Sequence, residues 1–139
     1  MSTVLIVDDD QGMIRLLQML FELEGFQVVT VSSFEDVLPT CREVLPDVIL
    51  MDLRLRGQET LPLLRQIRRE DGLANIPVVM TSGMDCRHRC LEAGADLFLL
   101  KPFLPSEVVG AVRQVLNASG VAASGDPMQR AEQNGIELR

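Results

Sequence analysis

The chain has 139 residues, and 47% of them are hydrophobic, which is enough for one domain with a buried core but short for two. Its 20 acidic residues outnumber its 13 basic ones, which argues against a non-specific nucleic-acid binder and favours cations or basic partner surfaces. No apolar run approaches the roughly 18 residues of a membrane span, and three cysteines do not make a disulfide framework. We therefore expect a cytoplasmic protein that binds neither a membrane nor nucleic acid directly.

Short apolar runs and longer amphipathic segments alternate along the chain. The expected strands, in order, are Val4–Val7, Val28–Val31, Val48–Met51, Val78–Met80 and Leu97–Leu100. Between them apolar residues recur with helical spacing, for example at Met13, Leu17, Leu20 and Phe21. Apolar runs without alternation that are joined by helices predict an α/β fold. The expected fold is a five-stranded parallel sheet, doubly wound, with three layers.

Local signals indicate where helices begin and end. Gly25 and Gly94 stand where two helices should stop. Pro39 falls inside the second helix and should kink it or delay its start. Thr60 is expected to cap the third helix, with Pro62 in its first turn.

Polar side chains follow four of the expected strands at their carboxyl ends. These side chains are Asp8, Asp9 and Asp10, then Asp52, then Thr81-Ser82-Gly83, and finally Lys101-Pro102. In an open α/β sheet the carboxyl ends share one edge, where the binding crevice lies. Crowded carboxylates repel, because two unit charges about 4 Å apart cost on the order of 4 kcal/mol at a surface-like dielectric. A bound divalent cation would make the same crowding of carboxylates favourable. Hard oxygen ligands that leave room for water on the ion suit Mg²⁺. Asp10 is favoured as the cap of the first helix rather than as a ligand.

The single lysine of the chain stands at one of these strand ends. Twelve of the 13 basic residues are arginine, and the remaining one is Lys101. A compact ammonium on a flexible stem acts as a point charge that can sit beside a carboxylate or a phosphoryl oxygen. A codon bias toward arginine would also explain why the chain has only one lysine. The position of Lys101 at the end of an expected strand nevertheless favours a functional role.

Five short motifs occur together in an order and spacing that resemble one family. They are Val7-Asp8-Asp9, Val48-Ile49-Leu50-Met51-Asp52, Pro77-Val78-Val79-Met80-Thr81-Ser82, Glu92-Ala93-Gly94-Ala95-Asp96 and Leu99-Leu100-Lys101-Pro102-Phe103. Over residues 3–117 the chain resembles the receiver domain of two-component response regulators. The resemblance implies a flavodoxin-like strand order, 2-1-3-4-5, and a cis Lys101-Pro102 bond. Residues 1–117 would be the receiver domain, and residues 118–139 a linker or C-terminal tail.

The resemblance also implies a role for each residue of the candidate site. Asp52 would accept a phosphoryl group from a histidine kinase or a histidine phosphotransfer protein. Asp9 and Asp52, with the main-chain carbonyl of Arg54, would bind Mg²⁺, and Asp8 would help through a water molecule. Phosphoryl transfer needs mainly positioning and neutralisation of charge, and Mg²⁺ with Lys101 would supply both. The protein would not be an enzyme beyond catalysing its own phosphorylation and dephosphorylation.

The conformational switch is expected to involve residues from the last two strands. Ser82 would hydrogen-bond the phosphoryl group, Lys101 would pair with it, and Phe98 would change rotamer on phosphorylation. Arg54 and Met84 would overhang the phosphoryl group and set its lifetime, since neither is an acid or amide that could orient a hydrolytic water. A phosphorylation-dependent homodimer is a further expectation.

Two segments depart from the family pattern. After the phosphoacceptor the family usually has a proline and then an Asp-Gly pair, whereas Arg56, Glu59 and Thr60 stand there in this chain. That loop should therefore be non-standard. The segment from Ser82 to Gly94 is shorter than usual, so the fourth helix should be short or irregular.

Two clusters have ordinary structural interpretations. Cys86 and Cys90 lie one helical turn apart with His88 between them, but a structural zinc site needs four ligands, so a partly exposed helix is favoured. A basic cluster on the third helix is expected to form a solvated face; it comprises Arg65, Arg68 and Arg69.

Two other functions stay open. One is a phosphatase of the haloacid-dehalogenase type, because Asp8-x-Asp10 after an apolar strand matches its opening motif, although Gln11 and Gly12 do not continue that motif. The other is a pseudo-receiver, an interaction module that keeps the fold without phosphorylation. The presence of Asp52 and Lys101 argues against this second alternative.

Overall fold

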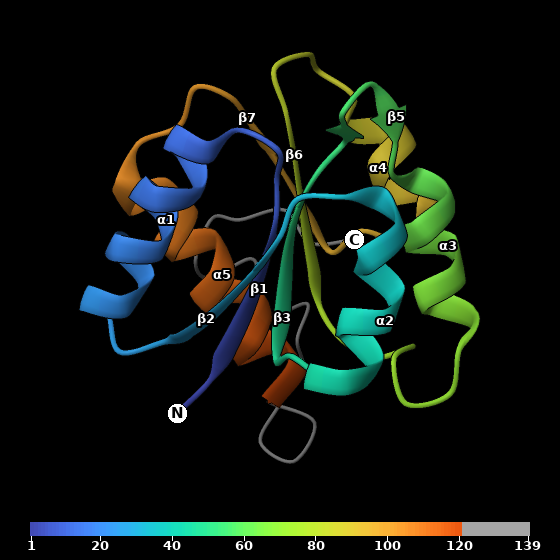
Figure 1. Ribbon diagram of the computed structural model, residues 1–139, viewed down its shortest axis with the longest axis horizontal. Helices are drawn as coiled ribbons and strands as arrows, with labels where there is room; N and C mark the ends of the chain where they lie inside the picture. The colour runs from blue at the N-terminus through green and yellow to red at the C-terminus, as the bar shows by residue number, and fades with distance from the viewer. Residues whose placement is uncertain (121–139) are drawn as a thin grey trace.

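The computed structural model describes residues 1–120, and in these residues a parallel sheet forms the centre of the molecule (Figure 1). The sheet contains β1 (Thr3–Val7), β2 (Gln27–Val31), β3 (Val48–Asp52), β6 (Val78–Ser82) and β7 (Leu97–Leu100). Their order across the sheet is β2-β1-β3-β6-β7, and every pairing is parallel. This confirms the predicted order 2-1-3-4-5, counted over the five strands of the sheet.

Five helices cover the two faces of the sheet in the described part of the chain. They are α1 (Gln11–Leu23), α2 (Phe34–Val44), α3 (Leu61–Arg69), α4 (Arg87–Ala93) and α5 (Pro105–Gly120). Helices α1 and α5 pack on one face, and α2, α3 and α4 pack on the other (Figure 1). The result is the three-layer arrangement that the sequence predicts.

Both faces of the sheet are buried, which explains why its strands do not alternate. In β1, Val4 and Ile6 join the core beneath α1 and α5, whereas Leu5 and Val7 join the core beneath the other helices. All four side chains are 0% exposed. Successive residues of a strand point to opposite faces, so a strand covered on both sides needs apolar side chains throughout.

Four local signals for the ends and course of the helices can be compared with the structure. Gly25 and Gly94 have φ of 92° and 118°, which glycine adopts readily at the end of a helix. Helix α2 begins at Phe34 and continues through Pro39, so its start is not delayed; a kink at Pro39 stays a prediction. Thr60 stands at the N-cap position of α3, but its side chain makes no capping hydrogen bond.

The fourth helix is short, as predicted: α4 has seven residues. Helix α5 continues to Gly120, past the expected boundary at residue 117. Residues 121–139 lie outside the described part of the chain, so a linker or tail there stays a prediction. Within residues 1–120, none of the helices has the length and apolar character needed to cross a membrane.

The expected solvated face on α3 is wrong for Arg68. Its guanidinium donates hydrogen bonds to the main-chain oxygens of Ala74, Ile76 and Gly94, and to the carboxylate of Asp96. The Arg68 side chain is 22% exposed, whereas Arg65 and Arg69 are exposed as expected. Arg68 therefore connects α3 to the segment before β6 and to the turn between α4 and β7.

Candidate metal and phosphoacceptor site

Three carboxylates meet at the carboxyl edge of the sheet. Asp8 follows β1 and Asp52 ends the neighbouring strand β3, where the register pairs Val7 with Met51. Asp8, Asp9 and Asp52 each offer an oxygen, and these oxygens all lie within 4.8 Å of one another. The predicted convergence is confirmed, because adjacent parallel strands bring their ends to the same edge.

The ammonium of Lys101 lies between two of these carboxylates. Its Nζ is 3.1 Å from Oδ2 of Asp8 and 3.0 Å from Oδ2 of Asp52. Lys101 follows β7, and strand β6 lies between β7 and β3, so the side chain reaches across the end of β6. The Lys101-Pro102 peptide bond is cis, as the resemblance implied.

Burial and charge set the protonation of this pair. Burial raises the pKa of Asp52 above its ordinary value, although the ammonium of Lys101 opposes that shift. Burial alone would lower the pKa of Lys101, but the carboxylates of Asp8 and Asp52 outweigh it, and the net shift is upward. Lys101 is therefore a cation at neutral pH, and Asp52 is a partly desolvated carboxylate beside it.

The three consecutive aspartates have three different roles. The Asp8 carboxylate accepts the main-chain N–H of Asp10 at 2.9 Å and faces Lys101. Asp10 caps α1, because its carboxylate accepts the N–H of Met13 at 3.1 Å. Asp9 points toward the loop after Asp52, where it accepts the N–H of Arg56 at 2.8 Å. The preference for Asp10 as a cap is thus confirmed.

The loop after Asp52 is a small hairpin, which fits the prediction that it is non-standard. Strand β4 (Arg54–Leu55) pairs antiparallel with β5 (Gln58–Glu59). Arg56 and Gly57 at its tip have φ of 49° and 81°. Glu59 pairs with Arg89 of α4 and lies 3.9 Å from the Arg54 guanidinium. The hairpin therefore touches the carboxylate site on one side and α4 on the other.

A pocket of about 290 Å³ opens beside Asp52. The predicted residues that line it are Asp52, Arg54, Ser82, Met84 and Lys101. Ser82 is buried, and its Oγ accepts the N–H of Met84 at 3.1 Å. Arg54 and Met84 are exposed. Phe98, the predicted switch aromatic, is 8% exposed and packs in the core beneath α2, α3 and α4.

Sequence reasoning missed two residues at the site. Cys86 lines the pocket beside Asp52, although the sequence favours only a place on a partly exposed helix for it. Thr60 donates its hydroxyl proton to the main-chain oxygen of Asp52 at 2.7 Å. The one available signal for Thr60 was its departure from the family's usual Asp-Gly pair.

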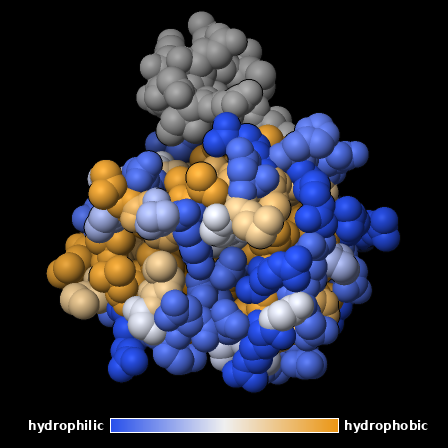
Figure 2. Space-filling view, turned by 90° about the horizontal axis from the view of Figure 1, so that it is seen from above, coloured by the Kyte–Doolittle hydropathy of each residue, from blue (hydrophilic) through white to orange (hydrophobic). Residues whose placement is uncertain are grey.

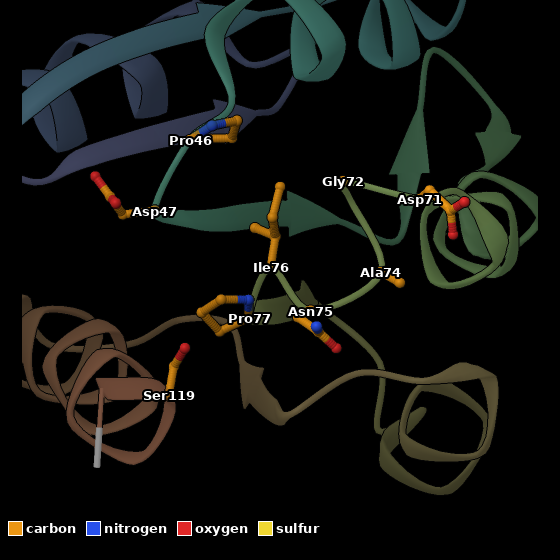
Figure 3. Close-up of a pocket in the computed structure, with 9 residues that line it drawn as sticks. All are labelled: Pro46, Asp47, Asp71, Gly72, Ala74, Asn75, Ile76, Pro77 and Ser119. Atoms are coloured by element: carbon orange, nitrogen blue, oxygen red, sulfur yellow. The ribbon is translucent and has the colours of Figure 1, made fainter. Parts of the chain in front are cut away.

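A second hollow lies at the opposite edge of the sheet (Figure 3). It has a volume of about 360 Å³ and is lined mainly by the segments before β3 and β6, with Ser119 of α5 at one side. Its two acids, Asp47 and Asp71, are both exposed, and Asp47 accepts the N–H of Thr3 at 2.7 Å. In the described residues the ion pairs of Lys101 with Asp8 and Asp52 lie instead at the carboxyl edge, which is therefore the stronger candidate for chemistry.

Comparison with known proteins agrees with this geometry. The family model of the response regulator receiver domain matches residues 4–113. This chain belongs to that family. PhoP, the alkaline phosphatase synthesis transcriptional regulatory protein of Bacillus subtilis, is 32% identical over 135 residues, which cover 95% of this chain and 55% of PhoP. The chain spans about half the length of the curated relatives it matches.

Solved structures support the receiver fold. A putative response regulator from Chloroflexus aurantiacus is 32% identical, with a TM-score of 0.78 over 83% of this chain and 97% of that protein. The receiver domain of the sensor histidine kinase PA1611 from Pseudomonas aeruginosa was solved with a magnesium ion in its active-site cleft. It has a TM-score of 0.76 over 84% of this chain and 98% of that domain, at 22% identity.

Proposed function

We propose that this receiver domain accepts a phosphoryl group on Asp52 in a Mg²⁺-dependent reaction and changes conformation in response. The observation that carries the proposal is the 3.0 Å contact between Lys101 Nζ and Asp52 Oδ2, because Asp52 belongs to a cluster of three carboxylates and also lines a pocket. A helix cap or a turn would need only one of these acids. Partly or fully buried carboxylates facing one ammonium are instead suited to binding a cation and a transferred anion together.

The carboxylate cluster fits Mg²⁺ in the chemistry of its donors. Asp9 and Asp52, with the main-chain carbonyl of Arg54, would bind the ion, and Asp8 would contact it through water; all are hard oxygen donors. The bound ion would neutralise charge that develops on the transferred group. The magnesium in the PA1611 receiver domain supports this assignment.

The other proposed roles belong to side chains around the pocket. Asp52 would be the nucleophile, and its pKa, raised by burial, makes it a stronger base than an exposed aspartate. Lys101 would then pair with the phosphoryl oxygens, and Ser82 would donate its hydroxyl proton to them. Phe98, packed in the core beneath α2, α3 and α4, would change rotamer on phosphorylation. Arg54 and Met84 would set the lifetime of the phosphorylated state.

We propose a histidine kinase or a histidine phosphotransfer protein as the phosphoryl donor. Exposed hydrophobic side chains gather on α1 at Leu16, Met19 and Leu23. Seen from the carboxyl edge of the sheet, hydrophobic surface gathers on the side of α1 (Figure 2). An exposed apolar patch of this kind suits a partner protein.

Three other expectations stay predictions. The first is output through a downstream domain or a phosphorylation-dependent homodimer. The others are a cytoplasmic location and the lack of direct binding to a membrane or to nucleic acid.

Incubation with Mg²⁺ and acetyl phosphate tests the proposal. Intact-mass measurement should show one stable phosphoryl group on the wild-type chain and none on Asp52→Asn or after chelation of Mg²⁺. A phosphatase of the haloacid-dehalogenase type would instead turn over many equivalents of phosphodonor. A pseudo-receiver would acquire no phosphoryl group, and that result would refute the proposed function.

A further inference from the structure

Thr60 makes contacts that its place at the start of a helix does not require. The residue is 0% exposed. Its hydroxyl oxygen lies 2.7 Å from the main-chain oxygen of Asp52 and 3.1 Å from that of Leu53, and its N–H donates to Leu53 at 2.7 Å. Thr60 has two donors, its hydroxyl and its main-chain N–H. Both point to main-chain oxygens of the segment that carries Asp52.

This arrangement replaces an ordinary helix cap. A threonine at the N-cap usually accepts an N–H from the first turn, a contact worth about 1 kcal/mol. Thr60 has helical dihedrals, φ −92° and ψ 0°, and makes no side-chain cap on α3. The Thr60 hydroxyl therefore hydrogen-bonds the main chain of Asp52 and Leu53 and does not cap α3.

The contact closes the base of the hairpin formed by residues 54–59. That hairpin begins two residues after Asp52 and ends at the residue before Thr60. Near its tip, the N–H of Arg56 bonds the carboxylate of Asp9 at 2.8 Å. The segment between Asp52 and the Arg54 carbonyl is thus fixed at the base of the hairpin by Thr60 and near its tip by Asp9.

We infer that Thr60 is a positioning residue for phosphoryl transfer to Asp52. It acts through the main chain: its hydroxyl holds the carbonyl of Asp52 and so fixes the segment that carries the Asp52 carboxylate and the Arg54 carbonyl, the two groups that would bind Mg²⁺. This inference rests on the proposed function. Small displacements of reacting groups and ligands lower rates steeply, so the loss of one fixed hydrogen bond should be measurable.

Three variants of the full chain test this inference. Thr60→Val keeps the shape but removes the hydroxyl, Thr60→Ser keeps the hydroxyl, and Ile67→Val removes a methylene from a residue of α3 that is 0% exposed. Mg²⁺ affinity of the unphosphorylated protein is measured by NMR titration. Phosphorylation by acetyl phosphate is measured against Mg²⁺ concentration, and Tm is measured for each variant.

We expect Thr60→Val to lower both the Mg²⁺ affinity and the phosphorylation rate by about tenfold. Thr60→Ser should restore most of both, while Ile67→Val should lower Tm and leave both at wild-type values. Wild-type Mg²⁺ affinity and rate in Thr60→Val would overturn the inference, as would equal losses in Ile67→Val, which would indicate a stability effect alone. If Thr60→Val does not fold, Thr60→Ala takes its place. Absence of phosphorylation in the wild type would instead refute the proposed function itself.

Discussion

Lys101 Nζ lies 3.0 Å from Oδ2 of Asp52, although the two residues are 49 positions apart and strand β6 lies between their strands. The Lys101 side chain is 20% exposed and the Asp52 side chain 16%. The pair is therefore largely shielded from water. In such an environment either charge without its partner would destabilise the fold. A cation held in this way can keep the Asp52 side chain in place before phosphorylation and pair with a phosphoryl group afterwards.

Lys101→Arg should impair activation although the charge is retained. The ammonium sits between Asp8 and Asp52 at 3.1 and 3.0 Å, and a planar guanidinium does not fit a site shaped for a point charge. We expect phosphorylation by acetyl phosphate to slow by about tenfold. The NMR spectrum should also change less on phosphorylation than that of the wild type. Wild-type behaviour of Lys101→Arg in both measurements would show that the geometry of the cation is unimportant.

Asp9→Asn should abolish phosphorylation and leave the fold intact. The substitution removes one of three like charges whose oxygens lie within 4.8 Å, so the metal-free variant should be at least as stable as the wild type in urea. The amide oxygen can still accept the N–H of Arg56. Asp10→Asn, which removes a neighbouring charge but can still cap α1, is the matched control and should be phosphorylated normally. A clearly destabilised Asp9→Asn would contradict the repulsion argument.

Met84→Glu and Arg54→Asn should each shorten the lifetime of the phosphorylated state severalfold. Both residues line the pocket beside Asp52, and their present side chains do not offer an acid or amide to orient an attacking water. Decay of the phosphoryl group after removal of the donor gives the rate. Leu23→Glu places the same acid at an exposed position at the end of α1 and should decay as the wild type does. Unchanged decay in both pocket variants would mean that these side chains do not reach the site.

Alkaline pH should destabilise the fold through Cys41. Burial raises the pKa of this thiol from 9.0 to about 11. Because the folded state favours the neutral thiol, its stabilising effect is complete below pH 9.0 and is lost as the pH rises through about 11. The loss is on the order of 2 kcal/mol. Stability should therefore fall less between about pH 7 and about pH 11 in Cys41→Ala than in the wild type.

Val37→Ala is the matched control for that substitution. Val37 is also 0% exposed and lies on the same helix, α2, but carries no titratable group. Its substitution should lower the free energy of unfolding equally at both pH values. A Cys41→Ala variant with the same pH dependence as Val37→Ala would show that the buried thiol does not contribute.

Arg68→Met should destabilise the protein although the residue lies outside the site. It leaves the carboxylate of Asp96 and the carbonyls of Ala74, Ile76 and Gly94 without the Arg68 donor, at a cost of about 2–3 kcal/mol. Arg65→Met, on the same helix but exposed, should change stability by less than about 0.5 kcal/mol. Urea unfolding of the two variants gives the comparison, and equal effects would mean that the Arg68 contacts add nothing.

Much of the fold could be predicted because it depends on local pattern. The apolar run of β1 indicates a strand buried on both faces, and the parallel arrangement brings Asp8, Asp52 and Lys101 to one edge. The sequence predicts that β6 ends at Met80, but the strand continues through Ser82. Thr81 and Ser82 pair with Leu99 and Leu100 of β7. Neither residue is apolar, so the hydrophobic pattern does not indicate that the strand includes them.

The remaining features depend on contacts between distant segments. The hairpin after Asp52 is tied to Asp9 across 47 positions, and Arg68 contacts Gly94 across 26. Nothing in the local sequence of α3 distinguishes the partly buried Arg68 from the exposed Arg65. Likewise, Thr60 looks like a helix cap by position, and only the folded chain shows its hydroxyl bonded to Asp52.

The most direct test of the central claim is to locate the phosphoryl group. The wild-type chain is treated with acetyl phosphate and Mg²⁺ and reduced with borohydride, which converts an acyl phosphate of aspartate into homoserine, and its peptides are sequenced by mass spectrometry. The structure predicts homoserine at position 52 alone, because Asp52 is the carboxylate that both lines the pocket and contacts Lys101. Reduction at Asp8 or Asp9, or no reduced residue at all, would contradict the assignment of Asp52 as the phosphoacceptor.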